Sequence, residues 1–161
     1  MSTRQNILVL CAHNSARSQM AEAFLRMHGG DRFAVHSAGL HATEIHPLTR
    51  RVMEEVGVPL EGHHAKPVSD FLGKLAVHHL IIVCESTERE CPKLLLGSLR
   101  RHFWPFPDPA AAEGDQGQQL AAFRSVRDNI QHRVLDWLRE SDADARSTSR
   151  KATPSDPKEA R

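Results

Sequence analysis

Residues 7–18 read Ile-Leu-Val-Leu-Cys-Ala-His-Asn-Ser-Ala-Arg-Ser. The first four form a continuous apolar run rich in branched side chains, which predicts a short strand buried on both faces. A polar turn follows. From Ser18 to Met27 apolar residues recur with helical spacing, until Gly29 and Gly30 end the pattern. We therefore predict a strand, a turn and a helix in direct succession.

The turn has the chemistry of an anion trap. Its successive backbone N–H groups can converge on one point, and the N-terminus of the following helix adds partial positive charge. The same field stabilises a thiolate at Cys11, and the planar fork of Arg17 can hold two oxygens of a tetrahedral anion. Ser18 can donate a hydrogen bond to the thiolate, and Asn14 suits a turn position with positive φ. We predict a nucleophilic Cys11 in an oxyanion-binding loop made of Ala12, His13, Asn14, Ser15, Ala16, Arg17 and Ser18.

Strands and helices continue to alternate along the chain. Further strands are predicted at residues 33–36, 79–84 and 102–104, and helices at residues 47–56, 69–75 and 120–138. This order predicts an α/β fold in which a single domain, residues 1–140, has a four-stranded parallel sheet with helices on both faces. Ligands bind beyond the carboxyl ends of the strands in such sheets, and Cys11 and Cys84 both fall there.

Composition narrows the class of protein. The chain has 161 residues and a formal net charge of +1, which fits one domain and gives no reason to expect a nucleic-acid or membrane partner. No apolar run is long enough for a signal peptide or a membrane span, so we expect a cytoplasmic protein. Residues 141–161 lack large apolar side chains, which predicts a disordered C-terminal tail.

The chain has three cysteines, Cys11, Cys84 and Cys91. An odd, small number in a cytosolic chain argues against a structural disulfide framework. No Cys-x2-Cys or paired histidine spacing supports a zinc site, and we expect neither a metal nor a cofactor. Each cysteine alone has a plainer interpretation: a buried residue before an arginine, a core residue, or an inert surface thiol. The strand-turn-helix context favours a nucleophile at Cys11.

Several motifs in a fixed order carry a resemblance to a known family. They are the stretch 11–22, Ser-Ala-Gly at 37–39, the pair Cys84 and Cys91, Trp-Pro-Phe-Pro-Asp-Pro-Ala-Ala at 104–111, and Phe-Arg-Ser-Val-Arg-Asp at 123–128. Together they resemble the low-molecular-weight tyrosine phosphatase fold and, within it, the arsenate reductases, over residues 6–140.

The resemblance implies reduction of arsenate, for which phosphate and sulfate are analogues. Cys11 would attack arsenate, Arg17 and the loop would hold the oxyanion, and Asp108 would protonate the leaving oxygen. Cys84 would then attack the sulfur of Cys11, and Cys91 would carry the disulfide outward to thioredoxin, the expected electron donor, with glutaredoxin as the alternative. Without the resemblance, Asp108 is an ordinary turn aspartate before a proline.

This transfer of the disulfide from cysteine to cysteine, the relay, requires Cys84 and Cys91 to come close together. A helix would hold their Cα atoms roughly 10 Å apart, whereas a disulfide needs about 4.4–6.8 Å. We therefore expect this segment to unwind when the two cysteines pair. Ser86 and Thr87 near its start, and Pro92 just after it, are typical of limited helical stability.

Three departures from the family pattern keep alternatives open. The chain has no tyrosine and alanines follow Asp108-Pro109, which favours a reductase over a tyrosine phosphatase. Ala12, His13 and Ala16 replace a Thr-Gly and a second cysteine of many thioredoxin-coupled reductases, which leaves the electron donor open. Lys66 falls near an aspartate that helps bind potassium in relatives, and its ammonium near Glu22 and Asn14 would supply that charge. The alternatives are a phosphatase that uses only Cys11, Arg17 and Asp108, and a non-catalytic oxyanion-binding module.

Overall fold

The computed structural model describes residues 4–90 and 100–151. Its strands are β1 (Gln5–Cys11), β2 (Phe33–Gly39), β3 (His79–Ile82) and β4 (Arg100–Phe103). Its α-helices are α1 (Arg17–Gly29), α2 (Pro47–Glu55), α3 (Glu85–Glu90) and α4 (Gln116–Lys151). Three short 3₁₀ helices complete it: η1 (Gly30–Arg32), η2 (Val68–Asp70) and η4 (Pro109–Ala111).

The four strands form one parallel sheet in the order β2-β1-β3-β4, as the sequence predicts. The apolar run from Ile7 to Leu10 is fully buried because β1 lies inside the sheet with both faces covered. In the register of the sheet, Cys11 pairs with Gly39 of β2 and Leu10 pairs with Ile82 of β3. Cys11 and Cys84 therefore both emerge at the carboxyl edge, from neighbouring strands.

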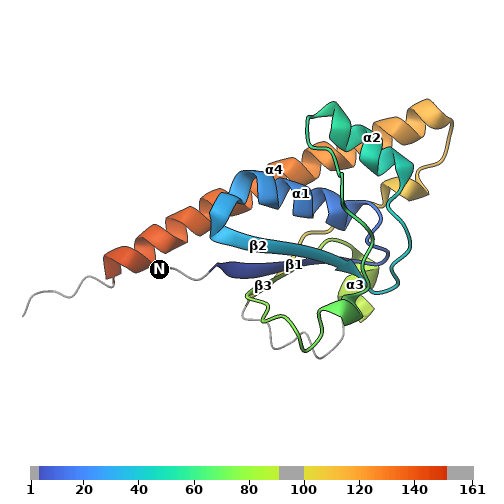
Figure 1. The fold of residues 1–161 in the computed structure, drawn as a ribbon. Helices are drawn as coiled ribbons and strands as arrows, with labels where there is room; N and C mark the ends of the chain where they lie inside the picture. The colour runs from blue at the N-terminus through green and yellow to red at the C-terminus, as the bar shows by residue number, and fades with distance from the viewer. Residues whose placement is uncertain (1–3, 91–99, 152–161) are drawn as a thin grey trace, which may run out of the picture.

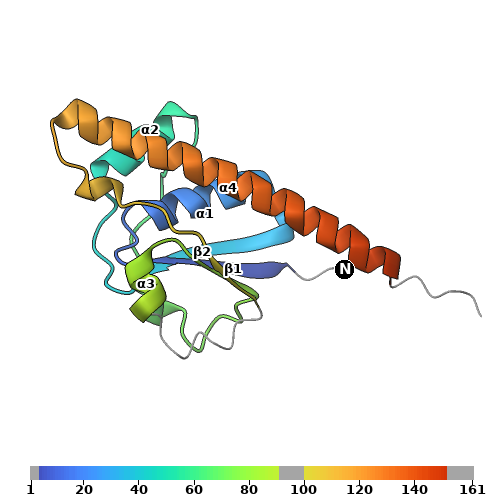
Figure 2. The ribbon, with the colours of Figure 1, turned by 180° about the vertical axis from the view of Figure 1, so that it is seen from behind.

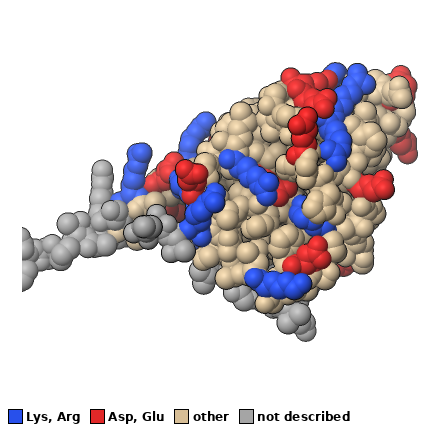
Figure 3. Space-filling model, viewed as in Figure 1, with Lys and Arg blue, Asp and Glu red and all other residues tan. Residues whose placement is uncertain are grey.

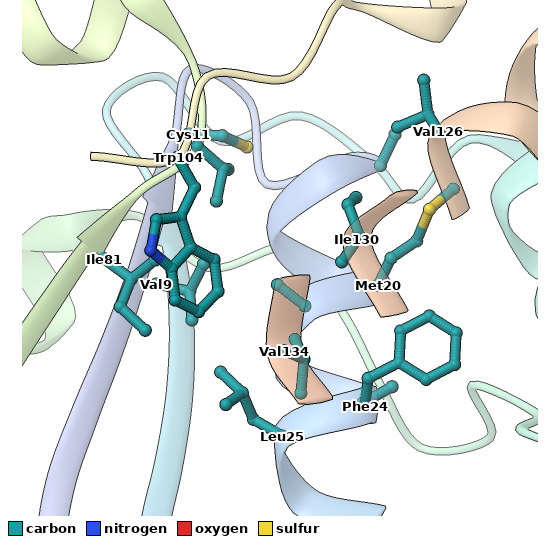
Figure 4. Close-up of a cluster of buried hydrophobic side chains, with 14 of the residues drawn as sticks. Val9, Cys11, Met20, Phe24, Leu25, Ile81, Trp104, Val126, Ile130 and Val134 are labelled. Carbon is teal, nitrogen blue, oxygen red and sulfur yellow. The ribbon is translucent and has the colours of Figure 1, made fainter. Parts of the chain in front are cut away.

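One face of the sheet is covered by α1, α2 and α4, with α4 running diagonally across α1 (Figures 1 and 2). The predicted apolar stripe of α4 is buried against α1 and the sheet; its members are Phe123, Val126, Ile130, Val134 and Trp137. Figure 4 shows Ile130 and Val134 beside Met20 and Phe24 of α1, with Cys11 at the loop end of the same cluster. Cys11, the predicted nucleophile, therefore lies against a well-packed part of the core.

The opposite face is covered more thinly. Leu8, Leu10, Leu80 and Ile82 pack there against the segment 68–77, and α3 lies on this side as well (Figure 1). The sequence predicts a helix at residues 69–75, but the structure has only the 3₁₀ turn η2 followed by turns. Gly73 adopts φ 73° there, a left-handed conformation that interrupts a right-handed helix.

Helix α4 is longer than the predicted 120–138 and continues past the expected domain boundary at residue 140 as far as Lys151. Beyond Leu138 it buries no large apolar side chain, and the charged and small residues there need only the helix's own hydrogen bonds and water. Arg32 forms an ion pair with Asp142 along this extension. Residues 152–161 of the expected tail lie outside the described residues.

Charges of both signs are interspersed on the face shown in Figure 3, with no continuous basic stripe. Among the helices of the described ranges, none combines the length and the apolar composition that crossing a bilayer requires.

Candidate active site

The loop between β1 and α1 is held from outside by its neighbour. Four backbone N–H groups of segment 40–46 donate to loop carbonyls: Leu40 to Cys11, His41 to Ala12, Thr43 to His13 and His46 to Ser15, at 2.8–3.2 Å. Gly39 makes this close approach possible, because a Cβ there would stand 2.7 Å from the backbone nitrogen of Asn14. The loop carbonyls are thereby satisfied on the outer side.

The loop's amide groups remain available on the inner side. Within the described part of the chain, the N–H groups of His13, Ser15 and Ala16 donate to no protein acceptor, and that of Asn14 points at Cys11 Sγ, 3.2 Å away. Helix α1 begins at Arg17, directly after the loop. This arrangement of unused amides and a helix N-terminus is that of a tetrahedral-anion site.

Asn14 locks the shape of the loop. It is fully buried and adopts φ 53°, the left-handed conformation that the sequence predicts. Its side-chain amide donates to Ser18 Oγ and Ser37 Oγ, at 2.7 and 2.9 Å, and its Oδ1 accepts from Gln19 Nε2 and the Lys66 backbone N–H, both at 2.9 Å. With two donors and two acceptors all used, the side chain has a single orientation.

Cys11 is 3% exposed, and its Sγ lies 2.9 Å from Ser18 Oγ. Because Asn14 donates to the hydroxyl oxygen of Ser18, that oxygen acts as an acceptor and its own hydrogen is free to point at the sulfur. Ser18 can therefore donate to a thiolate, as the sequence predicts.

Arg17 lies at the mouth of the site with its side chain 12% exposed. Its Nη1 donates to the carbonyl oxygen of Phe106 at 3.0 Å, and its Nη2 lies 4.0 Å from Asp108 Oδ2. Asp108 is 45% exposed, and its Oδ1 accepts from the N–H of Ala110 at the start of η4. The carbonyl bond fixes the guanidinium, and the acidic side chain faces it from a capped turn.

A pocket of about 480 Å³ opens at this edge, lined by Arg17, Cys84, Glu85, Ser86, Pro105, Phe106, Pro107 and Asp108. It brings together three of the predicted site residues, Arg17, Cys84 and Asp108, which are far apart in the sequence. Cys91 lies outside the described residues, although α3, which covers most of the stretch between it and Cys84, is helical.

Cys84 is 2% exposed, and Thr87 Oγ1 lies 2.8 Å from its Sγ. Burial alone raises the pKa of the Cys84 thiol. Hydrogen bonds from Thr87 and Ser86, and the charge of Arg17, outweigh the burial, so the pKa lies below its ordinary value. The thiol of Cys84, the second cysteine of the proposed relay, therefore loses its proton more readily than an ordinary cysteine thiol.

A buried carboxylate stands behind the loop. Glu22 is 1% exposed and accepts a hydrogen bond from Ser37 Oγ at 2.9 Å. Its carboxylate oxygens lie 3.0 Å from Arg26, 3.4 Å from His63 and 4.0 Å from Lys66 Nζ. Burial raises the pKa of Glu22, but these partners outweigh it and the pKa is lowered. Lys66 thus lies beside Glu22 and Asn14, where the sequence places it.

The sequence analysis assigned no supporting role to Gln19 of α1, Ser37 of β2, Thr87 of α3 or the carbonyl of Phe106. It named Glu22 of α1 only as a neighbour of Lys66 and not as a support of the loop. Gln19 and Glu22 carried a usable signal, because polar side chains in the apolar part of a helix must find partners. Thr87 and the Phe106 carbonyl carried none, since both act through tertiary contacts.

Comparisons with known proteins agree with this geometry. The model of the low molecular weight phosphotyrosine protein phosphatases matches residues 6–147. An arsenate reductase of Bacillus licheniformis is 34% identical over 135 residues, 82% of this chain and 94% of that protein. A solved arsenate reductase in its phosphate-binding state has a TM-score of 0.71 at 30% identity, covering 84% of this chain and 98% of that one.

A thioredoxin-dependent arsenate reductase of Corynebacterium glutamicum also has a similar structure, with a TM-score of 0.65 at 28% identity over 86% of this chain and 62% of that one. The region that the family model matches, residues 6–147, contains the loop, every strand residue except Gln5, and most of α4. The chain therefore belongs to the low molecular weight phosphotyrosine protein phosphatase family.

Proposed function

We propose that this chain reduces arsenate to arsenite with a cysteine nucleophile and an intramolecular disulfide relay. The observation that carries the proposal is the presence of a second cysteine, Cys84, whose pKa is lowered and which lies in the pocket that Arg17 and Asp108 line. Hydrolysis of a phosphomonoester needs only the first cysteine, the arginine and the acid. Similarity to several arsenate reductases supports the same activity.

The first step forms a thiolate–arsenate adduct. The Cys11 thiolate attacks arsenic, a sulfur–arsenic bond forms and an arsenic–oxygen bond breaks. The departing hydroxyl group of arsenate takes a proton from Asp108 and leaves as water. The loop amides and Arg17 hold the remaining oxygens, and Ser18 holds the thiolate before attack.

The second step is the reduction. The Cys84 thiolate attacks the sulfur of Cys11, a sulfur–sulfur bond forms and the sulfur–arsenic bond breaks. The electron pair of the broken bond stays on arsenic, which passes from As(V) to As(III), while the two cysteine sulfurs are oxidised to a disulfide. Cys11 and Cys84 leave adjacent strands at the same sheet edge, which supports this pairing.

The third step restores Cys11. The Cys91 thiolate attacks the sulfur of Cys84 and releases the Cys11 thiolate, so that the disulfide joins Cys84 and Cys91. An external dithiol then supplies two electrons and two protons. We take thioredoxin in the cytoplasm as this donor, supported by the similarity to the thioredoxin-dependent reductase of Corynebacterium glutamicum. Glutaredoxin with glutathione is the competing donor.

Arsenite release tests the proposal directly. The purified chain is given arsenate with thioredoxin, thioredoxin reductase and NADPH, or with glutathione and glutaredoxin, and Cys84→Ser is the matched variant. We expect arsenite release with thioredoxin, and none from Cys84→Ser with either donor. Hydrolysis of p-nitrophenyl phosphate without arsenite release would make the chain a phosphatase. Phosphate binding without either turnover would make it an oxyanion-binding module.

A further inference from the structure

The sulfur of Cys84 is in contact with two hydroxyl groups of α3. Thr87 Oγ1 lies 2.8 Å from Cys84 Sγ and Ser86 Oγ lies 3.6 Å from it. Thr87 is fully buried, whereas Ser86 is exposed. A threonine hydroxyl in a helix ordinarily bonds to a carbonyl three or four residues earlier, but here its bond is to the sulfur.

The contact with Thr87 can stabilise a thiolate that burial would otherwise destabilise. Cys84 is 2% exposed, and a thiolate removed from water is costly unless something replaces its hydration. The side chain of Thr87 is the largest of the contributions that lower the pKa of Cys84 against burial, ahead of Ser86 and Arg17. A valine would fill nearly the same volume as Thr87 but would offer no hydrogen.

We propose that Thr87 is a positioning residue for the reductive step, donating its hydroxyl hydrogen to Cys84 Sγ and presenting that sulfur as a thiolate to the adduct on Cys11. The inference rests on the proposed role of Cys84 as the second thiol. Thr87 keeps its proton throughout: the electron pair that forms the disulfide comes from Cys84, and the pair of the broken sulfur–arsenic bond leaves with arsenic.

The contact also links the redox state of Cys84 to the fold of α3. Thr87 lies in the first turn of α3, so its bond to the sulfur exists while this turn is helical. A thiolate is a charged acceptor and binds the hydroxyl strongly, whereas a disulfide sulfur is a weak neutral one. Oxidation of Cys84 therefore removes a bond that holds the first turn, at the moment when α3 must unwind for Cys91 to reach it.

A titration of Cys84 alone tests the proposal without turnover. In a Cys11→Ser/Cys91→Ser background Cys84 is the single cysteine, and the chain contains no tyrosine, so far-ultraviolet absorbance reports thiolate without overlap from phenolate. Thr87→Val should move the titration to higher pH, Thr87→Ser should restore it, and exposed Ser86→Ala should move it less. If the titration curve of this background is the same with Thr87→Val as without it, the proposal is wrong. Circular dichroism checks that each variant folds.

Single-turnover arsenite release, in the chain with all three cysteines, gives the second measurement. Thr87→Val should slow release about tenfold near neutral pH and recover as pH rises, while Thr87→Ser stays near wild type. Phosphate affinity should not change, because the oxyanion loop is untouched. If Cys84→Ser releases arsenite normally, the relay itself is wrong. If Cys84 is required and Thr87→Val is as fast as wild type at every pH, only the role of Thr87 fails.

Discussion

The two carboxylate oxygens of Asp108 have different partners. Oδ1 caps the turn η4 through the N–H of Ala110, while Oδ2 faces the Arg17 guanidinium at 4.0 Å. The cap orients the carboxyl without consuming the oxygen nearer the pocket. An asparagine can keep the capping bond through its own Oδ1, so Asp108→Asn removes the acid and leaves the turn in place.

We expect Asp108→Asn to slow the first chemical step by about 10²–10⁴-fold, the usual contribution of general acid catalysis. Phosphate binding, measured by calorimetry, should persist because Arg17 and the loop amides remain. Asp115→Asn is the matched control, since Asp115 caps the start of α4 in the same way and does not line the pocket. An unchanged single-turnover rate in Asp108→Asn would remove Asp108 from the mechanism.

At this scale the sequence predicts residues whose role follows from local geometry. The strand-turn-helix pattern alone predicts a positive φ at Asn14 and a hydrogen bond from Ser18 to Cys11, and the structure confirms the φ of Asn14 and the position of Ser18. The sequence does not predict partners that come from distant segments of the chain. Ser37 and the Lys66 backbone meet Asn14 from segments 23 and 52 residues away, and no local pattern specifies which side chains fold onto it.

Among the elements, α2 is tied to α4 by an ion-pair network. Glu55 lies at the end of α2, and its two carboxylate oxygens share the single N–H of Arg124 Nε. Arg124 Nη2 also donates to this carboxylate, and Arg127 Nη1 donates to it at 2.9 Å. Arg127 also reaches the carbonyl of Val52. The hydrogen bonds of Arg124, with those of Arg127, lower the pKa of Glu55 from 4.5 to about 2.

This network predicts an acid-sensitive contribution to stability. The pKa is lower in the folded state, so between pH 4.5 and about 2 the unfolded chain binds more protons than the folded one. The stabilisation is present above pH 4.5 and is lost as pH falls toward 2. Glu55→Gln should lower the melting temperature most at neutral pH, and the gap to wild type should narrow below pH 4.5.

Glu54→Gln provides the matched control, because Glu54 adjoins Glu55 on α2 and forms no ion pair with the described residues. Its melting curves should follow wild type at every pH. If the difference in melting temperature between Glu55→Gln and wild type stays constant down to the pH at which the protein unfolds, the charge of Glu55 does not contribute to stability.

The extension of α4 beyond residue 140 makes a separate prediction. Its side chains from Ser141 to Thr148 are half-buried or exposed, and the ion pair of Asp142 with Arg32 is between exposed groups. Such pairs are worth about 0–1 kcal/mol. Deleting residues 141–161 should therefore lower the free energy of unfolding by less than about 1 kcal/mol. Arsenite release should be unchanged, and a large fall in either quantity would show that the extension packs or acts.

Elements with strong periodicity are predictable from the sequence and marginal ones are not. The core of β1 and the stripe of α4 lie where expected, because each buries a continuous apolar surface. The expected helix at 69–75 reduces to η2, since it has only a short apolar stretch and Gly73 breaks it. The sequence predicts the end of α4 too early, because loss of apolar residues ends burial but does not by itself end a helix.

For the whole molecule, sheet order turns distant sequence positions into neighbours. Because β1 lies between β2 and β3, its carboxyl end receives Gly39 on one side and the Cys84 segment on the other. The β2 side shapes the anion loop, and the β3 side supplies the second thiol. The proposed oxyanion binding and the proposed thiol chemistry therefore lie at the same edge of the sheet.

This arrangement predicts a distinct trapped state for each cysteine. Cys11→Ser should abolish all turnover. Cys91→Ser should release one arsenite per chain and then stall with a Cys11–Cys84 disulfide, because nothing remains to attack Cys84. Wild type oxidised by arsenate should instead carry Cys84–Cys91 and lose the helicity of α3, since helical spacing holds these Cα atoms roughly 10 Å apart. Peptide mass mapping after acid quenching distinguishes these states, with Cys84→Ser as the control that forms neither.

Multiple turnover of Cys91→Ser with thioredoxin at the wild-type rate would show that the three-cysteine relay is wrong. The same result with glutathione and glutaredoxin alone would make Cys91 dispensable and change the donor.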